Sequence, residues 1–350
     1  MTSRSSSWKL MTRRRSRIFN VNEPASEELI RRMNMNADEK KANIRQIVIY
    51  LLITFIFTYA VEIFVIMPMA GSTDVTAAYT AQALISSVMF IPATGALLTI
   101  LFTKDRLTGN LRISLNLRGN LKYYALVWPG FALLIFLGAA LYFIIFPDHF
   151  DSEMGYVQVL LKAQAESAGA SADTVTAQQA KRVVTNQLMM GVVMAPLLNL
   201  LPCLGEEWGW RGYLLPRLLK QFKTVPALLL GGLIWGLWHA PLTVMGHNYG
   251  VGYRGYPVTG ILSMCIFCIV MGIILSYVTI KTKSCLPAVV GHGMLNGLAA
   301  FGVYFTSLEK PYNVFLGPSC VGLIGGAGFI ALAAALLYRL WKEENQKEPA

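Results

Sequence analysis

Apolar runs of about 20 residues recur along most of this chain, and short polar segments separate them. A helix needs about 20 mainly apolar residues to cross the hydrocarbon core of a bilayer. The pattern therefore predicts an all-α, polytopic membrane helix bundle with about eight transmembrane helices. The expected spans lie near residues 46–68, 81–103, 123–146, 186–204, 225–245, 258–280, 285–306 and 316–340.

The composition agrees with a membrane protein. Of the 350 residues, 55% are hydrophobic and only 14% are charged, which is too apolar for a soluble domain of this length. The net charge of +11 comes largely from Lys and Arg before the first span and in alternate loops. By the positive-inside rule, this predicts cytoplasmic termini in the plasma membrane rather than nucleic-acid binding. The expected parts are a basic segment 1–45, a membrane domain 46–341 and a tail 342–350.

Five polar side chains interrupt the apolar stretches of the second half: Glu206, Glu207, His239, His292 and Asn296. A charged group at the centre of a membrane helix costs about 3 kcal/mol or more, so such residues usually face a partner or a water-filled cavity. A functional site is therefore the first hypothesis for this set.

Helical spacing groups these residues in pairs. Glu207 and Arg211 are four positions apart and stack on one face, whereas Glu206 points about 100° away and is free for acid–base chemistry. His292 and Asn296 have the same spacing, so both emerge from one face and could donate hydrogen bonds to an oxyanion. The structural alternatives are a charge pair that ends a helix and a polar contact between helices.

A helical hairpin should bring two of the candidates to one depth. If the chain turns near residues 221–224, Glu206 and His239 are equally far from the turn and face the same layer. Small-x-x-x-small pairs beside both residues favour close helix packing. These pairs are Gly205 with Gly209 and Gly232 with Gly236.

The three motifs together resemble those of a known family. Glu206-Glu207-x-x-x-Arg211, Trp235-x-x-x-His239 and His292-x-x-x-Asn296 follow one another as in the CPBP (Abi, type II CAAX endopeptidase) family of intramembrane proteases. The resemblance covers about 186–306, which would be the catalytic core. Trp235 departs from the Phe that is common at its position.

This resemblance implies hydrolysis of a peptide bond near the C-terminus of a membrane-associated, in some relatives prenylated, protein or peptide. It implies that Glu206 activates water with help from His239, and that His292 and Asn296 stabilise the oxyanion. Glu207 and Arg211, with Trp235 beside them, would shape the site or bind the substrate. The surrounding membrane lipid is the other expected partner.

Three questions stay open at this point. Glu206, His239 and His292 could bind Zn²⁺ with an open fourth position, although a water held by Glu206 and His239 needs no ion, and the metal-free site is preferred here. A secondary transporter would also need ionisable groups inside spans. An inert bacteriocin self-immunity protein could share the same fold.

The remaining polar residues are expected to carry less weight. Glu62, in the outer third of the first span, should extend to the membrane interface, because long polar side chains can do so. His149 and His247 fall in outer loops. The outer segment 148–182 has helical periodicity and fits a solvated connector or a lid.

The expected topology can be measured directly. A reporter fused after Lys342 should be active only in the cytoplasm, because an even number of spans returns the chain to the side of its basic N-terminus. A periplasmic or extracellular signal would contradict the even number of spans.

Overall fold

The computed structural model describes residues 35–72, 74–107 and 111–346, and within them the chain is helical with one isolated β-bridge, between Phe150 and Thr306. The all-α prediction is confirmed. The predicted basic segment lies outside the described residues up to position 34. The helices are α3 (Ala37–Val61), α4 (Met67–Ala70), α5 (Val75–Val88), α6 (Ile91–Thr103), α7 (Leu121–Val127), α8 (Pro129–Ile145), α9 (Gly155–Ser167), α10 (Ala177–Val193), α11 (Ala195–Leu198), α12 (Leu200–Glu207), α13 (Leu215–Gln221), α14 (Thr224–Trp238), α15 (Ala240–Val244), α16 (Val258–Thr282), α17 (Leu286–Leu298) and α18 (Ala327–Asn345).

The chain is an integral membrane protein, but a count of eight spans is not confirmed. Among the described residues, four helical segments are long and apolar enough to cross a bilayer: Ala37–Ala70, Leu121–Ile145, Val258–Thr282 and Leu286–Phe305. A fifth candidate is the pair Thr80–Val88 and Ile91–Thr103, which bends by 42°. Thr224–Trp238 is apolar but shorter.

Proline breaks two of the expected spans. Pro196 lies in the first turn of α11 and Pro241 in the first turn of α15, so the stretches near 186–204 and 225–245 are series of short helices. Proline lacks an N–H and its ring clashes with the preceding turn, which ends a helix or kinks it. As a result His239 stands at the junction between α14 and α15.

The last expected span is also shorter than predicted. Residues 316–326 form turns, and α18 begins only at Ala327. Glycines allow this segment to fold closely on itself, since a Cβ at Gly325 would lie 2.2 Å from the carbonyl oxygen of Ser319. Gly322 and Gly326 therefore serve the packing of these turns.

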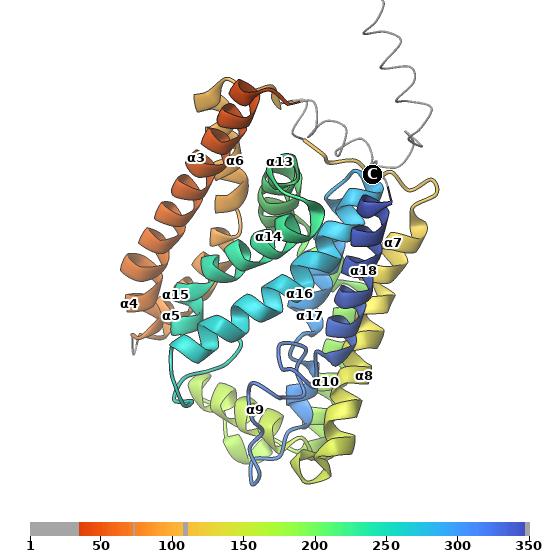
Figure 1. The fold of residues 1–350 in the computed structure, drawn as a ribbon. Coiled ribbons are helices and arrows are strands. Elements are labelled where there is room, and N and C mark those ends of the chain that lie inside the picture. Colours follow the sequence, from red (N-terminus) through yellow and green to blue (C-terminus); the bar gives the residue numbers. More distant parts are fainter. Residues whose placement is uncertain (1–34, 73, 108–110, 347–350) are drawn as a thin grey trace, which may run out of the picture.

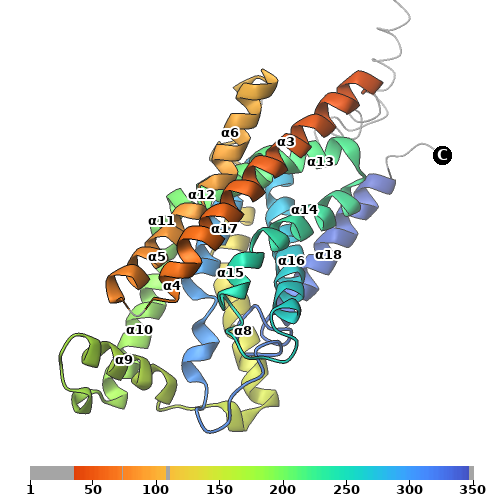
Figure 2. The same cartoon turned by 90° about the vertical axis from the view of Figure 1, so that its left-hand side faces the viewer.

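The helices form two groups, one on each side of α14 (Figure 1). Helices α3 and α6 pack together on one side, while α16, α17, α18 and α8 pack on the other (Figure 1, Figure 2). The α9 segment and the start of α10 lie at the end opposite to the start of α3 (Figure 1). The expected outer segment is thus largely helical.

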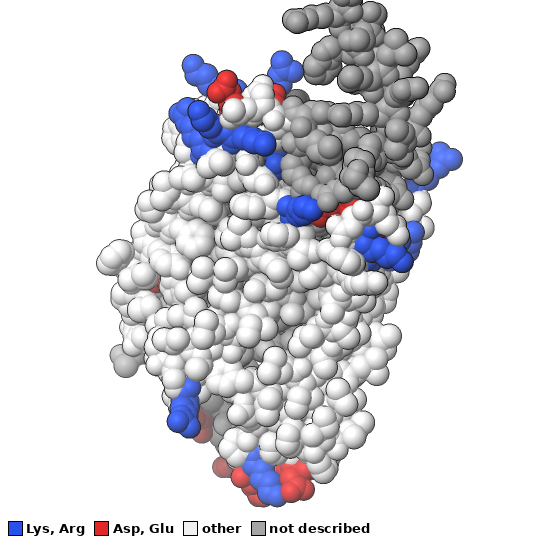
Figure 3. Space-filling model, in the orientation of Figure 1, with Lys and Arg blue, Asp and Glu red and all other residues white. Residues whose placement is uncertain are grey.

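Charged side chains lie mainly at the two ends of this face, and the larger group of Lys and Arg is at one of them (Figure 3). Lys and Arg side chains gather where α3 begins and α18 ends, and the long middle zone of this face is white (Figure 3). The starting end of α3 and the finishing end of α18 therefore share one side, as the predicted topology requires. The side of the membrane that this end faces stays a prediction.

The small-residue pairs permit close packing, as expected, and the two pairs contact different parts of the chain. Gly232 and Gly236 on α14 face α16, where a Cβ would come within 2.5 Å of the Cα atoms of Ile269 and Cys265 respectively. Gly205 and Gly209 instead face the chain at Met89–Pro92, at the start of α6. Backbone contact of this kind holds membrane helices together.

Adjacent glycines on α14 give a matched test of this packing. Gly232→Ala should lower the free energy of unfolding by about 1–3 kcal/mol, because the new methyl group meets backbone that cannot move aside. In Gly231→Ala the nearest atom is Leu218 Cδ1 at 3.5 Å, an ordinary contact, so stability should hold or rise. Thermal unfolding in detergent measures both, and equal melting temperatures would contradict the packing argument.

Candidate active site

The carboxylate pair lies where α12 widens into a π-helical segment. This segment spans Trp208–Leu214 and follows Glu206 and Glu207, which are both fully or almost fully buried. Arg211 Nη1 donates to Glu207 Oε1 at 2.9 Å, so the predicted i, i+4 pair is present inside the protein. π-Helical turns are rare and occur frequently at functional sites.

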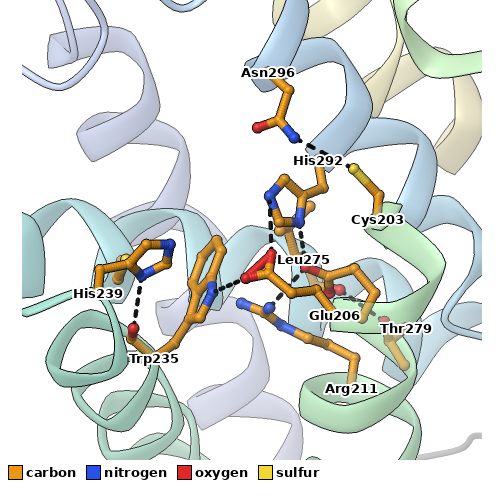
Figure 4. A network of polar contacts seen from close by, with 11 residues as sticks. Cys203, Glu206, Arg211, Trp235, His239, Leu275, Thr279, His292 and Asn296 are labelled. Carbon is orange, nitrogen blue, oxygen red and sulfur yellow. Dashed lines mark hydrogen bonds and ion pairs between the residues drawn. The ribbon is translucent and has the colours of Figure 1, made fainter. Parts of the chain in front are cut away.

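His292 on α17 connects the two carboxylates. Its Nδ1 lies 2.9 Å from Glu207 Oε1, and its Nε2 lies 3.3 Å from Glu206 Oε2 (Figure 4). Since carboxylate oxygens accept hydrogen bonds, a ring that is protonated on both nitrogens donates to both residues. Two negative charges are then balanced by His292 and Arg211 within one buried network.

Trp235 on α14 forms one wall of the network. Its Nε1 donates to Glu206 Oε1 at 3.3 Å, and the Arg211 guanidinium lies 4.2 Å from the centre of its ring. The ring also meets His292 edge to face, with centroids 5.5 Å apart. The departure from Phe at this position therefore adds a hydrogen-bond donor that a phenyl ring lacks.

His239 lies beside the network, and its ring bonds to the backbone of Trp235 rather than to Glu206 or His292. Its Nδ1 lies 2.9 Å from the carbonyl oxygen of Trp235, which can only accept, so Nδ1 carries a proton. In the neutral ring Nε2 is then the free acceptor. The Trp235 ring stands between His239 and Glu206 (Figure 4).

The prediction that Glu206 and His239 lie at the same depth therefore holds only approximately. Glu206 bonds to Trp235, one helical turn before His239. The π-helical segment rises less per residue than an α-helix, so positions equally far from the turn are not at equal depth. Counting residues along two regular helices could not include this effect.

Asn296 borders the network at the opposite edge. It lies one turn beyond His292 on α17, and its side chain is exposed. Its Nδ2 lies 3.5 Å from Cys203 Sγ, a weak acceptor. The structure therefore gathers Glu206, Glu207, Arg211, Trp235 and His292 into one network, with His239 and Asn296 on two sides.

The donor set for a zinc ion is not assembled in this structure. Among the described residues, no group of three His, Cys, Asp or Glu side chains lies in a position to hold a metal ion. Glu206 and His292 are bonded to each other, and His239 is turned toward Trp235 through Nδ1. The suggested Glu206, His239 and His292 site does not fit this geometry.

Two residues near the site, His247 and Glu62, were not expected from the sequence to be important. His247 stacks parallel to His239, with ring centroids 6.2 Å apart, although it lies in an exposed loop. Glu62 is fully buried, so the expectation that it extends to the interface is wrong. The signal for Glu62 was present, since an ionisable residue inside a span is rare and usually functional.

Comparison with known proteins agrees with the resemblance that the motifs gave. Residues 188–298 match the family model described as type II CAAX prenyl endopeptidase Rce1-like. The chain is also 32% identical over 100 residues to a protein of Methanococcus maripaludis named CAAX prenyl protease 2. This match covers 28% of the chain and 37% of the relative, so the chain spans well under half of the relative that it matches. The resemblance is therefore confirmed for the part of the chain that contains the network.

The buried pair Arg211–Glu207 can be compared with a more exposed pair of the same spacing, Arg339–Glu343. Arg211→Leu should lower the free energy of unfolding by about 3–5 kcal/mol, because it leaves buried carboxylates without a balancing charge. Arg339, whose side chain is 62% exposed, makes the same spacing with Glu343 at 3.0 Å, and Arg339→Leu should cost less than about 1 kcal/mol. Similar decreases in melting temperature for the two variants would show that the buried network contributes no more to stability than the exposed pair.

Proposed function

We propose that this chain is an intramembrane endopeptidase of the CAAX type. Its substrate would be a membrane-associated, prenylated protein or peptide that is cleaved near its C-terminus. The observation that carries the proposal is the buried network of Glu206, Glu207, Arg211 and His292, which lies within the segment matched by the Rce1-like family. A transporter is not favoured, since the match is to a peptidase family.

Glu206 is the proposed base. Its two oxygens each accept one bond, from Trp235 and from His292, and a carboxylate oxygen has room for a further donor. A water molecule held there would lose a proton to Glu206 while its oxygen attacks the carbonyl carbon of the peptide. His239 supports this step, because Nε2 is the free acceptor on its neutral ring.

The oxyanion would be stabilised by an amide donor. Both nitrogens of His292 already face carboxylates, so this histidine chiefly orients and balances the two glutamates. Asn296 has an exposed side chain whose Nδ2 contacts only a weak thiol acceptor among the described contacts. We assign the oxyanion contact mainly to Asn296, with Glu207 and Arg211 as positioning residues.

The proposed reaction needs no resident metal ion. Glu206 can take the proton directly, and the three residues that would coordinate zinc are not brought together as a ligand set. We further propose that both termini lie in the cytoplasm, on the basis of the charge distribution, and that the membrane is the plasma membrane.

The test is cleavage of a fluorogenic prenylated CAAX peptide by the purified chain in detergent. Glu206→Gln and His239→Ala should each lower the rate by about a hundredfold or more, because a proton acceptor is removed. The exposed Glu166→Gln is the matched control and should leave the rate unchanged. Removal of metal by a chelator should also have no effect.

Two outcomes would contradict parts of this proposal. Full activity in Glu206→Gln would remove the assigned base. Stoichiometric zinc that is lost together with activity would overturn the metal-free mechanism.

A further inference from the structure

Trp235 bonds to both proposed catalytic groups, through different parts of the residue. Its side-chain Nε1 donates to Glu206 Oε1 at 3.3 Å, and its backbone carbonyl oxygen accepts from His239 Nδ1 at 2.9 Å. Trp235 is 2% exposed and lies in α14, one helical turn before His239. One position in the chain therefore contacts the proposed base and the histidine that supports it.

The two oxygens of Glu206 contact side chains from two different helices. Trp235 on α14 reaches Oε1, and His292 on α17 reaches Oε2 at 3.3 Å. The last torsion of a glutamate side chain has broad minima, so a carboxyl group that is held at one oxygen can still turn. Contacts at both oxygens fix its plane, and the remaining lone pairs then point in a set direction. A water molecule that is to be activated needs such a fixed acceptor.

The indole ring of Trp235 is itself fixed by its neighbours. The Arg211 guanidinium lies 4.2 Å from the centre of the ring. The imidazole rings of His292 and His239 meet it edge to face, with centroids 5.5 and 5.6 Å away. A side chain whose rotamer is locked by packing can orient a catalytic group more accurately than a mobile one. The direction of the indole N–H is therefore set by the fold.

We propose that Trp235 is a positioning residue of the reaction, and that its indole N–H sets the direction of the Glu206 carboxylate. This inference rests on the proposed function. Trp235 acts through Glu206 and does not touch the reacting atoms. Phe, which is common at this position in the family that the motifs resemble, would keep an aromatic wall but has no N–H to donate. In this chain the exchange of Trp for Phe therefore changes the site and not only its shape.

The decisive variant is Trp235→Phe, which removes the indole N–H and keeps both an aromatic ring and the backbone carbonyl that His239 contacts. It should lower kcat by about tenfold or more in the cleavage assay, because a base that is no longer aligned slows the chemical step. KM should stay nearly unchanged, since the loss concerns the reaction and not the binding of the peptide. Wild-type kcat in Trp235→Phe would overturn the proposal.

Trp238 on the same helix provides a matched control. It is also 2% exposed, and its Nε1 donates to Thr58 Oγ1 at 2.8 Å, a partner outside the network. Trp238→Phe and Trp235→Phe each remove one buried hydrogen bond, so both should lower the melting temperature. Only Trp235→Phe should lower kcat. An equal loss of kcat in the two variants would show that the effect comes from general loss of packing, and the proposal would fail.

Nuclear magnetic resonance tests the bond without relying on cleavage. In the purified chain with isotope-labelled tryptophan, Trp235→Phe and Trp238→Phe identify the indole N–H signals of the two residues. Glu206→Gln should shift the Trp235 signal, because a neutral amide accepts a weaker hydrogen bond than a carboxylate does, and it should leave the Trp238 signal in place. An unmoved Trp235 signal, or equal shifts of both, would contradict the proposal.

The two measurements separate failure of this inference from failure of the proposed function. If the wild type cleaves no peptide while the Trp235 signal responds to Glu206→Gln as stated, the endopeptidase assignment fails and the orientation of Glu206 by Trp235 stands. If the wild type cleaves the peptide and Trp235→Phe does so with the same kcat, the endopeptidase assignment stands and the positioning role fails.

Discussion

Two carboxyl groups, a guanidinium and an imidazole hold one another in place inside the membrane domain. Glu207 accepts from both Arg211 and His292, and His292 also reaches Glu206. None of these charges could be buried alone, since an unpaired ion in low dielectric costs several kcal/mol. The network therefore requires α12 and α17 to meet, and it fixes the direction of the proposed base.

The helices around the network are shaped to permit this meeting. Glycines let α14 approach α16 and let α12 approach the start of α6, while prolines in the first turns of α11 and α15 separate these short helices from the ones before them. Short, broken helices inside a membrane leave backbone groups that must find partners, and such segments are tolerated where protein covers them. The irregular part of this fold is thus concentrated where the charged residues are.

Local helix geometry was predictable from the sequence, and long-range packing was not. The Glu207–Arg211 pair and the common face of His292 and Asn296 follow from a fixed helical repeat. The π-helical turn at 208–214 and the burial of Glu62 depend on which helices lie alongside, so spacing could not reveal them. The same holds for the separation of His239 from Glu206 by the Trp235 ring, and for helix breaks that reduce the number of continuous spans.

The exposed side chain of Asn296 has a consequence for kinetics. It stands at the edge of α17, next to Cys203, and one turn before Cys203 on α12 the side chain of Leu200 is 38% exposed. Exposed side chains inside a bilayer border acyl chains and not water. A lipid-anchored molecule would then arrive by diffusion in two dimensions, and its encounter rate would follow its mole fraction among the lipids. The rate of such an enzyme would therefore change when lipid is added while the bulk concentrations of enzyme and substrate are held constant.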